Sequence, residues 1–247
     1  MPDPSPSHAL PTFVDLWSST LSWQPSPQQQ EQFERLYQEI LTGNRILNLT
    51  RITEPEAFWE KHLWDSLCGI QPLLASPDAS LRMIDIGTGG GFPGIPAAIA
   101  LPQSSLTLLD ATQKKVRFLQ DLAITLSLPH VTGVSDRAEA LGHHPSHRAS
   151  YDWALLRAVA AAPVCAEYAL PLLKLNGTAI LYRGQWTPAE ADALNRALEI
   201  LGGRLIATTP ITTPLSQSQH HYLYILKIAP TPERFPRAIG VPKQRPL

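Results

Sequence analysis

Residues 82–94 read Arg82-Met-Ile-Asp-Ile-Gly-Thr-Gly-Gly-Gly-Phe-Pro-Gly94, which predicts a short buried strand, a glycine-rich turn and the start of a helix. Pro93 stands where the first turn of a helix tolerates a missing amide hydrogen. Glycine reaches positive φ and has no Cβ, so the backbone of such a turn can approach a ligand closely. The amides at the start of the following helix add free donors. We therefore expect a polar cofactor above this turn.

Two classes of cofactor fit the turn. The spacing Gly89-x-Gly91-x-x-Gly94 matches the dinucleotide fingerprint, in which a pyrophosphate lies on the helix N-terminus. Asp85 at the strand end favours instead an ammonium or a sulfonium, because its negative charge would repel a pyrophosphate. Asp110, at the end of the next predicted strand, could accept both ribose hydroxyls of either cofactor. The turn alone leaves S-adenosylmethionine and a nicotinamide dinucleotide open.

Short apolar runs alternate with stretches of helical periodicity around this turn, which indicates a doubly wound parallel sheet. The final two strands have no helix between them and are expected to pair as an antiparallel hairpin. The predicted fold class is α/β, with a mostly parallel seven-stranded sheet and helices on both faces. Strands are predicted at 82–86, 105–110, 131–134, 151–156, 177–182, 204–209 and 221–228, and helices at 94–101, 113–127, 159–174 and 188–201.

An N-terminal helical appendage is expected before the sheet. Its first helix repeats apolar residues over 28–42, and Gly43 is expected to end it. Capping boxes are predicted at Thr53-x-x-Glu56 for the second helix and at Thr187-Pro-x-Glu190. The expected divisions are a flexible leader and start of the appendage at 1–27, the appendage at 28–80, the catalytic domain at 81–229 and a Pro-rich basic tail without regular structure at 230–247.

Composition narrows the class of protein. The net charge of −1 over 247 residues argues against coating of nucleic acid by bulk charge, although a local cationic face remains open. Cys68 and Cys165 are far apart, so neither a disulfide framework nor a thiolate metal site is expected. No segment approaches the roughly 18 apolar residues of a membrane span, and the N-terminus does not read as a signal peptide. We expect a soluble cytoplasmic enzyme with no membrane partner.

Five motifs are distributed along the chain: Asn48-Leu-Thr50, Lys61-His-x-x-Asp-Ser66, Asp85-Ile-Gly-Thr-Gly-Gly-Gly-Phe-Pro-Gly-Ile-Pro96, Asp110-Ala-Thr-Gln-Lys-Lys115 and Ser135-Asp-Arg-Ala-Glu139. With these motifs the chain resembles the RsmG (GidB) family over nearly its whole length. That family methylates N7 of a guanine in the 530 loop of 16S (small-subunit) ribosomal RNA. The resemblance implies a Rossmann-like class I methyltransferase fold, S-adenosyl-L-methionine as cofactor, S-adenosyl-L-homocysteine as product, and the 16S RNA or the small subunit as partner of a monomer.

The expected cofactor residues come from the turn and from this resemblance. Asp85, Gly89 and Gly91 belong to the turn itself. Asp136, which lies in the motif that contains Ala138 and Glu139, could instead be an ordinary helix N-cap. One departure from the family is Gly90, which replaces a more usual Pro or Ala and adds backbone freedom. The residues that the resemblance places on the cofactor are Gly87, Phe92, Asp110, Ala111, Thr112, Ala138, Glu139 and Arg157.

The expected substrate residues are cationic. Guanine N7 is an unprotonated lone pair, so no general base is required and the protein mainly positions its substrates. Arg183 stands where the family usually has Lys, which makes its role less secure. Lys61 and Asp65 could form an ordinary surface pair, and the cations that follow Asp110 could be a solvated helix face. The candidates for positioning are Lys61, His62, Arg157 and Arg183, and those for RNA binding are Lys114, Lys115, Arg117, Arg237, Lys243 and Arg245.

Other activities remain open at this point. An NAD(P)-dependent oxidoreductase could use the same glycine turn, a ribosomal RNA-binding protein could keep the fold without catalysis, and a small molecule or a protein could be the methyl acceptor. His143, His144 and His147 fall in a Pro/Ser-containing loop without a supporting carboxylate. We therefore expect a mobile surface loop there and no metal site.

Overall fold

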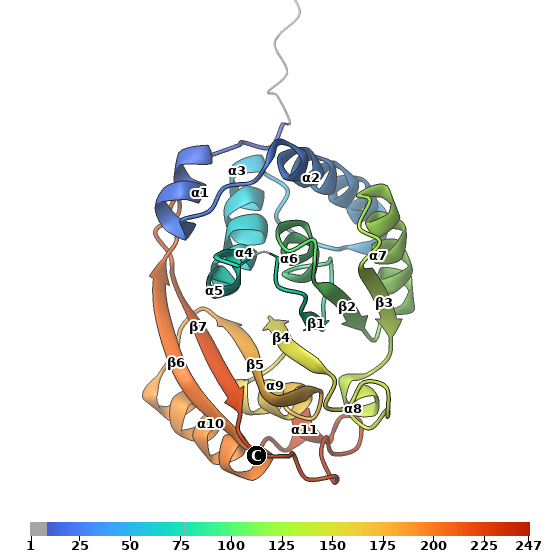
Figure 1. The fold of residues 1–247 in the computed structure, drawn as a ribbon, viewed down its shortest axis with the longest axis vertical. Coiled ribbons are helices and arrows are strands. Elements are labelled where there is room, and N and C mark those ends of the chain that lie inside the picture. Colours follow the sequence, from blue (N-terminus) through green and yellow to red (C-terminus); the bar gives the residue numbers. More distant parts are fainter. Residues whose placement is uncertain (1–8, 77) are drawn as a thin grey trace, which may run out of the picture.

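The computed structural model describes residues 9–76 and 78–247; residues 1–8 of the predicted leader, and residue 77, lie outside the described part. The fold is α/β with one seven-stranded sheet in the order β3-β2-β1-β4-β5-β7-β6 (Figure 1). This confirms the predicted fold class. The strands are β1 (Arg82–Ile86), β2 (Ser105–Asp110), β3 (Val131–Ser135), β4 (Tyr151–Arg157), β5 (Leu173–Arg183), β6 (Gly203–Thr212) and β7 (Gln219–Lys227).

Strand direction follows the expected pattern. Strands β1 to β5 pair in parallel, whereas β7 pairs antiparallel with both β5 and β6. β1 lies between β2 and β4, so the chain winds outward from β1 to β3 and then returns to continue on the other side. Such a reversal of strand order leaves a crevice at the carboxyl ends of the central strands. The crevice is therefore expected beside β1 and β4.

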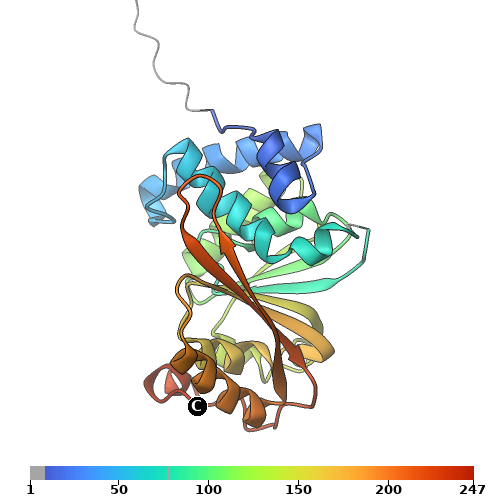
Figure 2. The ribbon, with the colours of Figure 1, turned by 90° about the vertical axis from the view of Figure 1, so that its left-hand side faces the viewer.

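Alternation along the central strands builds a core on each face of the sheet. In β1, Met83 packs into one apolar cluster, and Ile84 and Ile86 pack into the other. In β7, Tyr222 and Leu223 divide in the same way, because successive strand residues point to opposite faces. Figure 2 shows the resulting three layers, with helices above and below the strands. The expectation of helices on both faces is confirmed.

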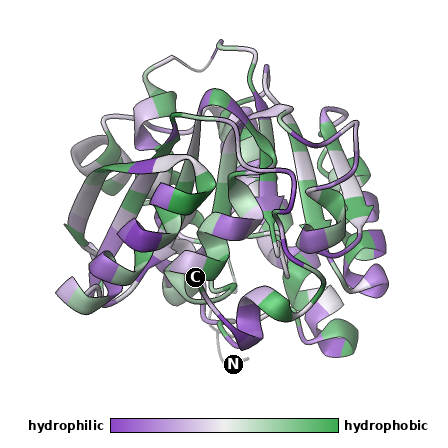
Figure 3. Cartoon of the chain, turned by 90° about the horizontal axis from the view of Figure 1, so that it is seen from below, coloured by the Kyte–Doolittle hydropathy of each residue, from purple (hydrophilic) through white to green (hydrophobic). Residues whose placement is uncertain are grey.

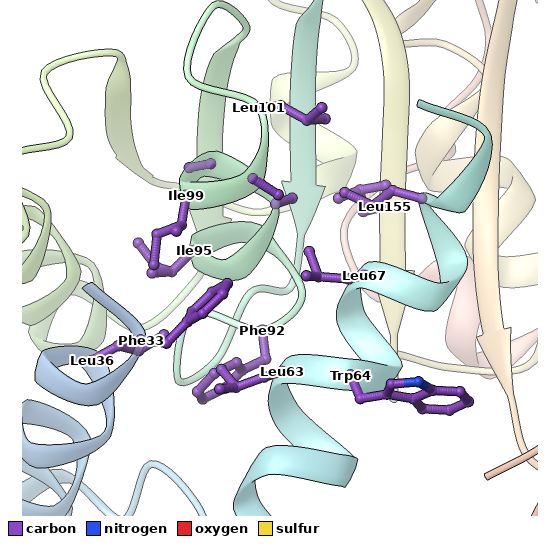
Figure 4. Close-up of a cluster of buried hydrophobic side chains, with 14 of the residues drawn as sticks. Phe33, Leu36, Leu63, Trp64, Leu67, Phe92, Ile95, Ile99, Leu101 and Leu155 are labelled. Carbon is purple, nitrogen blue, oxygen red and sulfur yellow. The ribbon is translucent and has the colours of Figure 1, made fainter. Parts of the chain in front are cut away.

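The helices of the N-terminal appendage belong to the first of these cores. Phe33 and Leu36 of α2 meet Ile95 of α6, while Leu63 and Leu67 approach from the other side (Figure 4). The helices on this face are α1 (Val14–Leu21), α2 (Pro27–Leu47), α3 (Pro55–Phe58), the π-helix η1 (Trp59–Trp64), α4 (Asp65–Gly69), α5 (Gln71–Leu74), α6 (Gly94–Ala100) and α7 (Gln113–Thr125).

The opposite face carries α8 (Ala138–Leu141), α9 (Ala162–Ala169), α10 (Pro188–Leu201) and α11 (Val241–Gln244). The capping box at Thr187 is confirmed: its side chain accepts from the Glu190 amide, and the Glu190 carboxylate accepts from the Thr187 amide. Seen from below, the helices carry both hydrophilic and hydrophobic stretches (Figure 3). This mixture is typical of helices that cover a core with one side only.

The predicted end of α2 is wrong. α1 lies within the range expected to hold the leader and the start of the appendage, and it buries Trp17 and Leu21. Gly43 does not end α2, which continues to Leu47 and ends at Asn48 in the left-handed region. A Cβ on Gly43 would collide with the Phe118 ring, so this glycine lets α2 and α7 approach closely. The cause in each case is tertiary packing, which local sequence does not contain.

The second capping box and the tail also differ from expectation. Thr53 caps nothing: α3 begins after Glu54 without a side-chain cap, and the Thr53 carbonyl accepts from Tyr37 instead. The second helix is itself present, because α3, η1 and α4 follow one another without a gap from Pro55 to Gly69, and α5 comes next. The tail contains α11 and buries Phe235. The division into domains stays a prediction, and none of the described helices is long and apolar enough to cross a bilayer.

Candidate cofactor and substrate site

A cavity of about 300 Å³, the first cavity, opens at the carboxyl ends of β1, β2 and β3. This is the edge at which doubly wound sheets bind ligands. Beyond the predicted cofactor residues, its wall includes Asp136, Val159, Tyr168 and three cations, Lys115, Arg137 and Lys243. The predicted cofactor residues that line it are Gly87, Asp110, Ala111, Thr112, Ala138 and Glu139.

Asp110 joins the glycine turn to the end of β2. One carboxylate oxygen accepts from the Gly89 amide at 3.0 Å, and the other accepts from the Thr112 amide at 2.8 Å. The carboxylate still faces the first cavity, and each oxygen has a further lone pair for a hydroxyl donor. Asp110 can therefore hold the turn and accept from a bound ribose at the same time.

The glycines of the turn have different physical roles. Gly87, Gly89 and Gly91 all have positive φ, at 74°, 58° and 95°. A Cβ on Gly91 would lie 2.9 Å from both Ile95 and Leu119, so this position is small for packing reasons. A Cβ on Gly89 would lie 3.9 Å from the Gly87 carbonyl oxygen, which leaves open space there. Of these three glycines only Gly87 lines the first cavity.

Asp85 lies beneath the turn and is fully buried. Its Oδ2 accepts from Thr88 Oγ1 at 2.6 Å and from the Gly94 amide at 2.8 Å, which ties β1 to the start of α6. Its Oδ1 has no hydrogen-bond partner among the described residues. Burial raises the pKa of Asp85 to about 6, because desolvation outweighs the two hydrogen bonds. Asp85 supports the turn and does not line the first cavity, so direct contact with a cofactor stays a prediction.

Phe92 packs against the appendage. Its ring stacks on His62, with centroids 4.2 Å apart and planes 10° apart, and the Arg157 guanidinium carbon lies 5.6 Å from the ring centroid. Only 5% of Phe92 is exposed. Phe92 therefore joins η1 to the glycine turn, and it lines neither the first cavity nor the second cavity described next.

A second cavity of about 400 Å³ lies at the carboxyl ends of β4 and β5. Arg157 and Ala158 line it, whereas the next residue, Val159, lines the first cavity. Ala158 has φ of 56°, a conformation that costs a non-glycine residue on the order of 1 kcal/mol. This strained turn separates the two cavities. The remaining lining residues of the second cavity are Asp65, Tyr182, Arg183, Gly184, Gln185 and His220.

The Asp65 carboxylate is the centre of a buried polar network at this cavity. It accepts from Arg157 at 3.0 Å, from His220 Nδ1 at 2.9 Å and from the Tyr222 hydroxyl at 2.8 Å. Burial alone would raise the pKa of Asp65, but the hydrogen bond from His220 and the charge of Arg157 outweigh it and hold the pKa below its ordinary value. The same hydrogen bond raises the pKa of His220. Both oxygens of the Asp65 carboxylate thus already accept hydrogen bonds.

Arg157 is held from further directions by the appendage. It donates to the Lys61 carbonyl at 2.6 Å and to His62 Nδ1 at 3.2 Å. Burial, followed by the charge of Arg157, lowers the pKa of His62 to about 3. His62 is therefore neutral, with Nδ1 as acceptor, and its Nε2 donates to Thr50 Oγ1 at 2.7 Å. Its position is that of a support for Arg157, and its ring is buried.

The structure places the predicted substrate cations in different environments. Lys61, Lys114, Arg117 and Arg245 have exposed side chains. Asp65 pairs with Arg157, so the expected surface pair of Lys61 and Asp65 is absent from the described structure. Arg183 donates to the Ala160 carbonyl and to Glu190, at 2.9 and 3.1 Å.

Arg237 is committed to an ion pair inside the protein. Its guanidinium binds the carboxylate of Glu167, which is fully buried. This contradicts a free RNA-binding role for Arg237. Lys115 and Lys243 line the first cavity, although both were predicted to bind RNA. The predicted RNA-binding set is therefore not one surface.

Asp65, His220 and Tyr222 were missed as site residues by sequence reasoning. Asp65 belongs to a recognised motif, but the only role that the sequence suggested for it was a possible surface pair with Lys61. His220 opens a strand, and only the sheet order brings that strand beside β5. A polar residue at the start of an antiparallel closing strand lies at the same edge as the carboxyl ends of the parallel strands. That position is the signal that could have identified His220.

The histidine loop was predicted to be mobile but contacts the tail. His143 Nε2 lies 2.7 Å from the Pro236 carbonyl. Arg148 donates to the carbonyls of Gly142 and Phe235 at 2.7 and 2.8 Å. Across residues 9–76 and 78–247, no group of three His, Cys, Asp or Glu side chains is arranged to hold a metal ion. The loop is therefore a docking site for the C-terminal segment.

Comparison with known proteins identifies close relatives. Residues 29–221 match the family model GidB, described as rRNA small subunit methyltransferase G. A ribosomal RNA small subunit methyltransferase G from Nostoc punctiforme is 56% identical over 98% of this chain and 100% of its own length. One from Synechococcus elongatus is 57% identical over 94% of this chain and 95% of its own length.

Among solved structures, the antibiotic-resistance methyltransferase Kmr aligns with a TM-score of 0.52 at 16% identity, covering 65% of this chain and 92% of its own. At that identity the likeness concerns the fold alone.

Proposed function

Because the chain belongs to the rRNA small subunit methyltransferase G (GidB) family, we propose that it transfers a methyl group from S-adenosylmethionine to N7 of a guanine in the 530 loop of 16S ribosomal RNA. The observation that supports this best is that two cavities lie on either side of residues 157–159, beside the switch in strand order. A two-substrate transfer needs two adjoining sites. Family membership favours this activity over an oxidoreductase and over a non-catalytic RNA-binding protein.

The first cavity fits an adenosyl cofactor. Asp110 can accept from ribose hydroxyls, and Ala111, Thr112, Ala138 and Glu139 supply the wall beside it. The open space at Gly89 and the unpartnered buried Oδ1 of Asp85 are compatible with a cationic ligand over the turn. When bound, S-adenosylmethionine supplies an electrophilic methyl group on a sulfonium. Val159 packs against Gly87 in the wall of the cavity, where a Cβ on Gly87 would lie only 2.9 Å from the Val159 side chain.

The second cavity is proposed as the site of the target base. Guanine N7 carries its own lone pair, so the reaction needs no general base. Asp65 agrees with this, because its oxygens are occupied by three donors. The residues of the second cavity then act by orienting the target base. Arg157 is fixed by Asp65, His62 and the Lys61 carbonyl, and Arg183 is fixed by Glu190 and Ala160.

RNA contact is proposed for exposed cations near these cavities. Lys61 lies on η1 beside the Asp65 network, and Lys114 and Arg117 lie on α7, which follows the strand end at Asp110. Flexible exposed cations are suited to phosphate oxygens. The proposal includes a monomer that acts in the cytoplasm on the 16S RNA or the small subunit.

The test is to map N7-methylguanosine in 16S RNA from cells with and without this protein. We expect one modification to disappear and to be restored when purified protein, S-adenosylmethionine and small subunits from the deletion strain are combined. If every N7-methylguanosine persists in cells without the protein, the proposed substrate is refuted. Binding of NAD(P) by the purified protein, with no binding of S-adenosylhomocysteine, would refute the cofactor.

A further inference from the structure

The C-terminal segment, residues 230–245, follows a fixed path across the face that carries α9. Arg148 donates from one guanidinium nitrogen to the Phe235 carbonyl at 2.8 Å and from the other to the Thr231 carbonyl at 2.9 Å. Phe235 is inserted into the apolar core on that side, with 3% of its surface exposed. These contacts fix the first part of the segment.

A buried ion pair fixes the middle of the segment. The Glu167 carboxylate on α9 has no exposed surface and accepts from the Arg237 amide and from its guanidinium, at distances of 2.6 to 3.1 Å. A buried carboxylate without a partner would be costly, so this pair holds Arg237 in one position. The chain is thereby directed toward α8 and the first cavity.

Glu139 connects the last part of the segment to the cavity. Its Oε1 accepts from the Gly240 amide at 3.0 Å and from the Tyr168 hydroxyl at 3.1 Å. Glu139 and Tyr168 both line the first cavity. The helical turn α11 follows at once, and it places Lys243 in the wall of that cavity. The segment is therefore part of the cavity as well as of the core.

We propose that the C-terminal segment forms the outer wall of the cofactor cavity and that Lys243 binds the cofactor. The inference rests on the proposed function. The Lys243 ammonium makes no hydrogen bond or ion pair within the described part of the chain. An ammonium is only a donor, so it binds an acceptor group of the ligand. An adenosyl amino acid carries such groups in its carboxylate and in the ring nitrogens of adenine.

Arg245 provides a matched comparison. It lies two residues beyond Lys243, carries the same charge and is exposed, but it does not line the first cavity. If the tail acted only as a basic arm for RNA, the two cations would contribute alike. If the tail is a wall of the cofactor cavity, only Lys243 affects the cofactor.

The experiment is calorimetric titration of the full-length, RNA-free protein with S-adenosylhomocysteine. Lys243→Met keeps an unbranched apolar side chain and removes the charge, and we expect it to weaken binding about five- to tenfold. Lys243→Arg should restore most of the affinity, and Arg245→Met should match the wild type. Methylthioadenosine, which lacks the carboxylate, serves as a second ligand. A loss confined to S-adenosylhomocysteine assigns Lys243 to the carboxylate, and an equal loss for both assigns it to the adenosine; either supports the proposal.

Unchanged S-adenosylhomocysteine affinity in Lys243→Met would overturn the proposal, as would equal losses in Lys243→Met and Arg245→Met. Weaker RNA binding by Lys243→Met without a change in cofactor affinity would return Lys243 to the RNA surface. Failure of the wild type to bind S-adenosylhomocysteine would instead refute the proposed function. Thermal unfolding of each variant verifies the fold, which an exposed lysine is not expected to control.

Discussion

Two buried aspartates show how the same side chain is tuned in opposite directions by its partners. Asp65 has three donors, one of them the Arg157 cation, and its pKa is lowered. Asp85 has two neutral donors on one oxygen and none of the described residues on the other, and its pKa is raised. Desolvation acts on both, so the difference comes from hydrogen bonds and nearby charge. Asp65 is the anion that orients Arg157, and Asp85 is a carboxyl group that would gain from a bound cation.

Asp85→Asn should stabilise the cofactor-free protein at neutral pH. The pKa of Asp85 rises from an ordinary value of 3.8 to about 6 on folding. Its favourable contribution is therefore present below pH 3.8 and is lost as the pH rises through about 6. Asn keeps an acceptor for Thr88 and Gly94 and carries no charge. We expect a gain of about 2 to 3 kcal/mol in the free energy of unfolding at pH 7.5, measured with urea.

The same gain should shrink toward zero at pH 4. Asp121→Asn, at an exposed position of α7, is the control and should change the free energy of unfolding by less than about 0.5 kcal/mol. A gain that is equal at both pH values would contradict a titration of Asp85. We also expect Asp85→Asn to weaken S-adenosylhomocysteine binding.

At the scale of a secondary-structure element, α7 presents different chemistry on different sides. Lys114 and Arg117, three residues apart, share an exposed side. Lys115 points to the first cavity, and Val116 and Leu119 are buried. One short helix thus separates a proposed RNA surface from a proposed cofactor wall, because its side chains rotate by about 100° per residue.

Charge reversal at Lys114 and Arg117 should weaken RNA binding and spare the cofactor. In Lys114→Glu/Arg117→Glu we expect the slope of log affinity against log salt to fall by about 1.5, since two phosphate contacts are lost. S-adenosylhomocysteine affinity should stay at the wild-type value. Filter binding to a 16S fragment over a salt series measures the first quantity, and calorimetry the second.

Arg196→Glu/Arg204→Glu makes the same change of charge at two exposed positions on α10 and β6. This pair does not line either cavity and should alter RNA affinity much less. Equal weakening by the two double variants would show that net charge, and no particular surface of α7, governs RNA binding.

At the scale of the whole molecule, the N-terminal appendage and the C-terminal segment are both built into the fold around the site. The appendage covers one face of the sheet and supplies Asp65 and His62 to the Arg157 network. The C-terminal segment covers part of the other face and supplies Lys243 to the first cavity. The site therefore contains residues from both sides of the predicted boundaries at residues 81 and 230.

Arg237→Ala should destabilise the whole protein, because it leaves the Glu167 carboxylate buried without a cation. Breaking a buried ion pair from one side costs about 3 kcal/mol or more. For a chain of this size we expect the melting temperature to fall by about 6 to 12 °C in a calorimetric scan. A fall of less than about 2 °C would show that the pair does not hold the tail in solution.

Arg245→Ala is the control and should leave the melting temperature unchanged. The double variant Arg237→Met/Glu167→Gln removes both charges and should recover more than half of the loss. Failure of the double variant to recover stability would assign the loss to packing of Arg237 and not to an unpaired Glu167.

The sequence by itself determined the parallel strands and the glycine turn, whereas the assignment of cofactor residues beside the turn stays a prediction. Their signals are local: short apolar runs between stretches of helical periodicity, glycines that can reach positive φ, and polar residues directly after strands whose carboxyl ends must meet at one edge. The confirmed capping box at Thr187 and Glu190 is local in the same way.

Only the tertiary structure decided the rest. The Asp65 network joins residues 65, 157, 220 and 222, and no spacing along the chain encodes that meeting. Gly43 lies inside α2 and does not end it, and the Phe118 ring occupies the space that a Cβ at this position would need. The proline-rich tail is ordered by Arg148, Glu167 and Glu139, which come from other elements. Burial and long-range pairing override local preference wherever distant segments share one core.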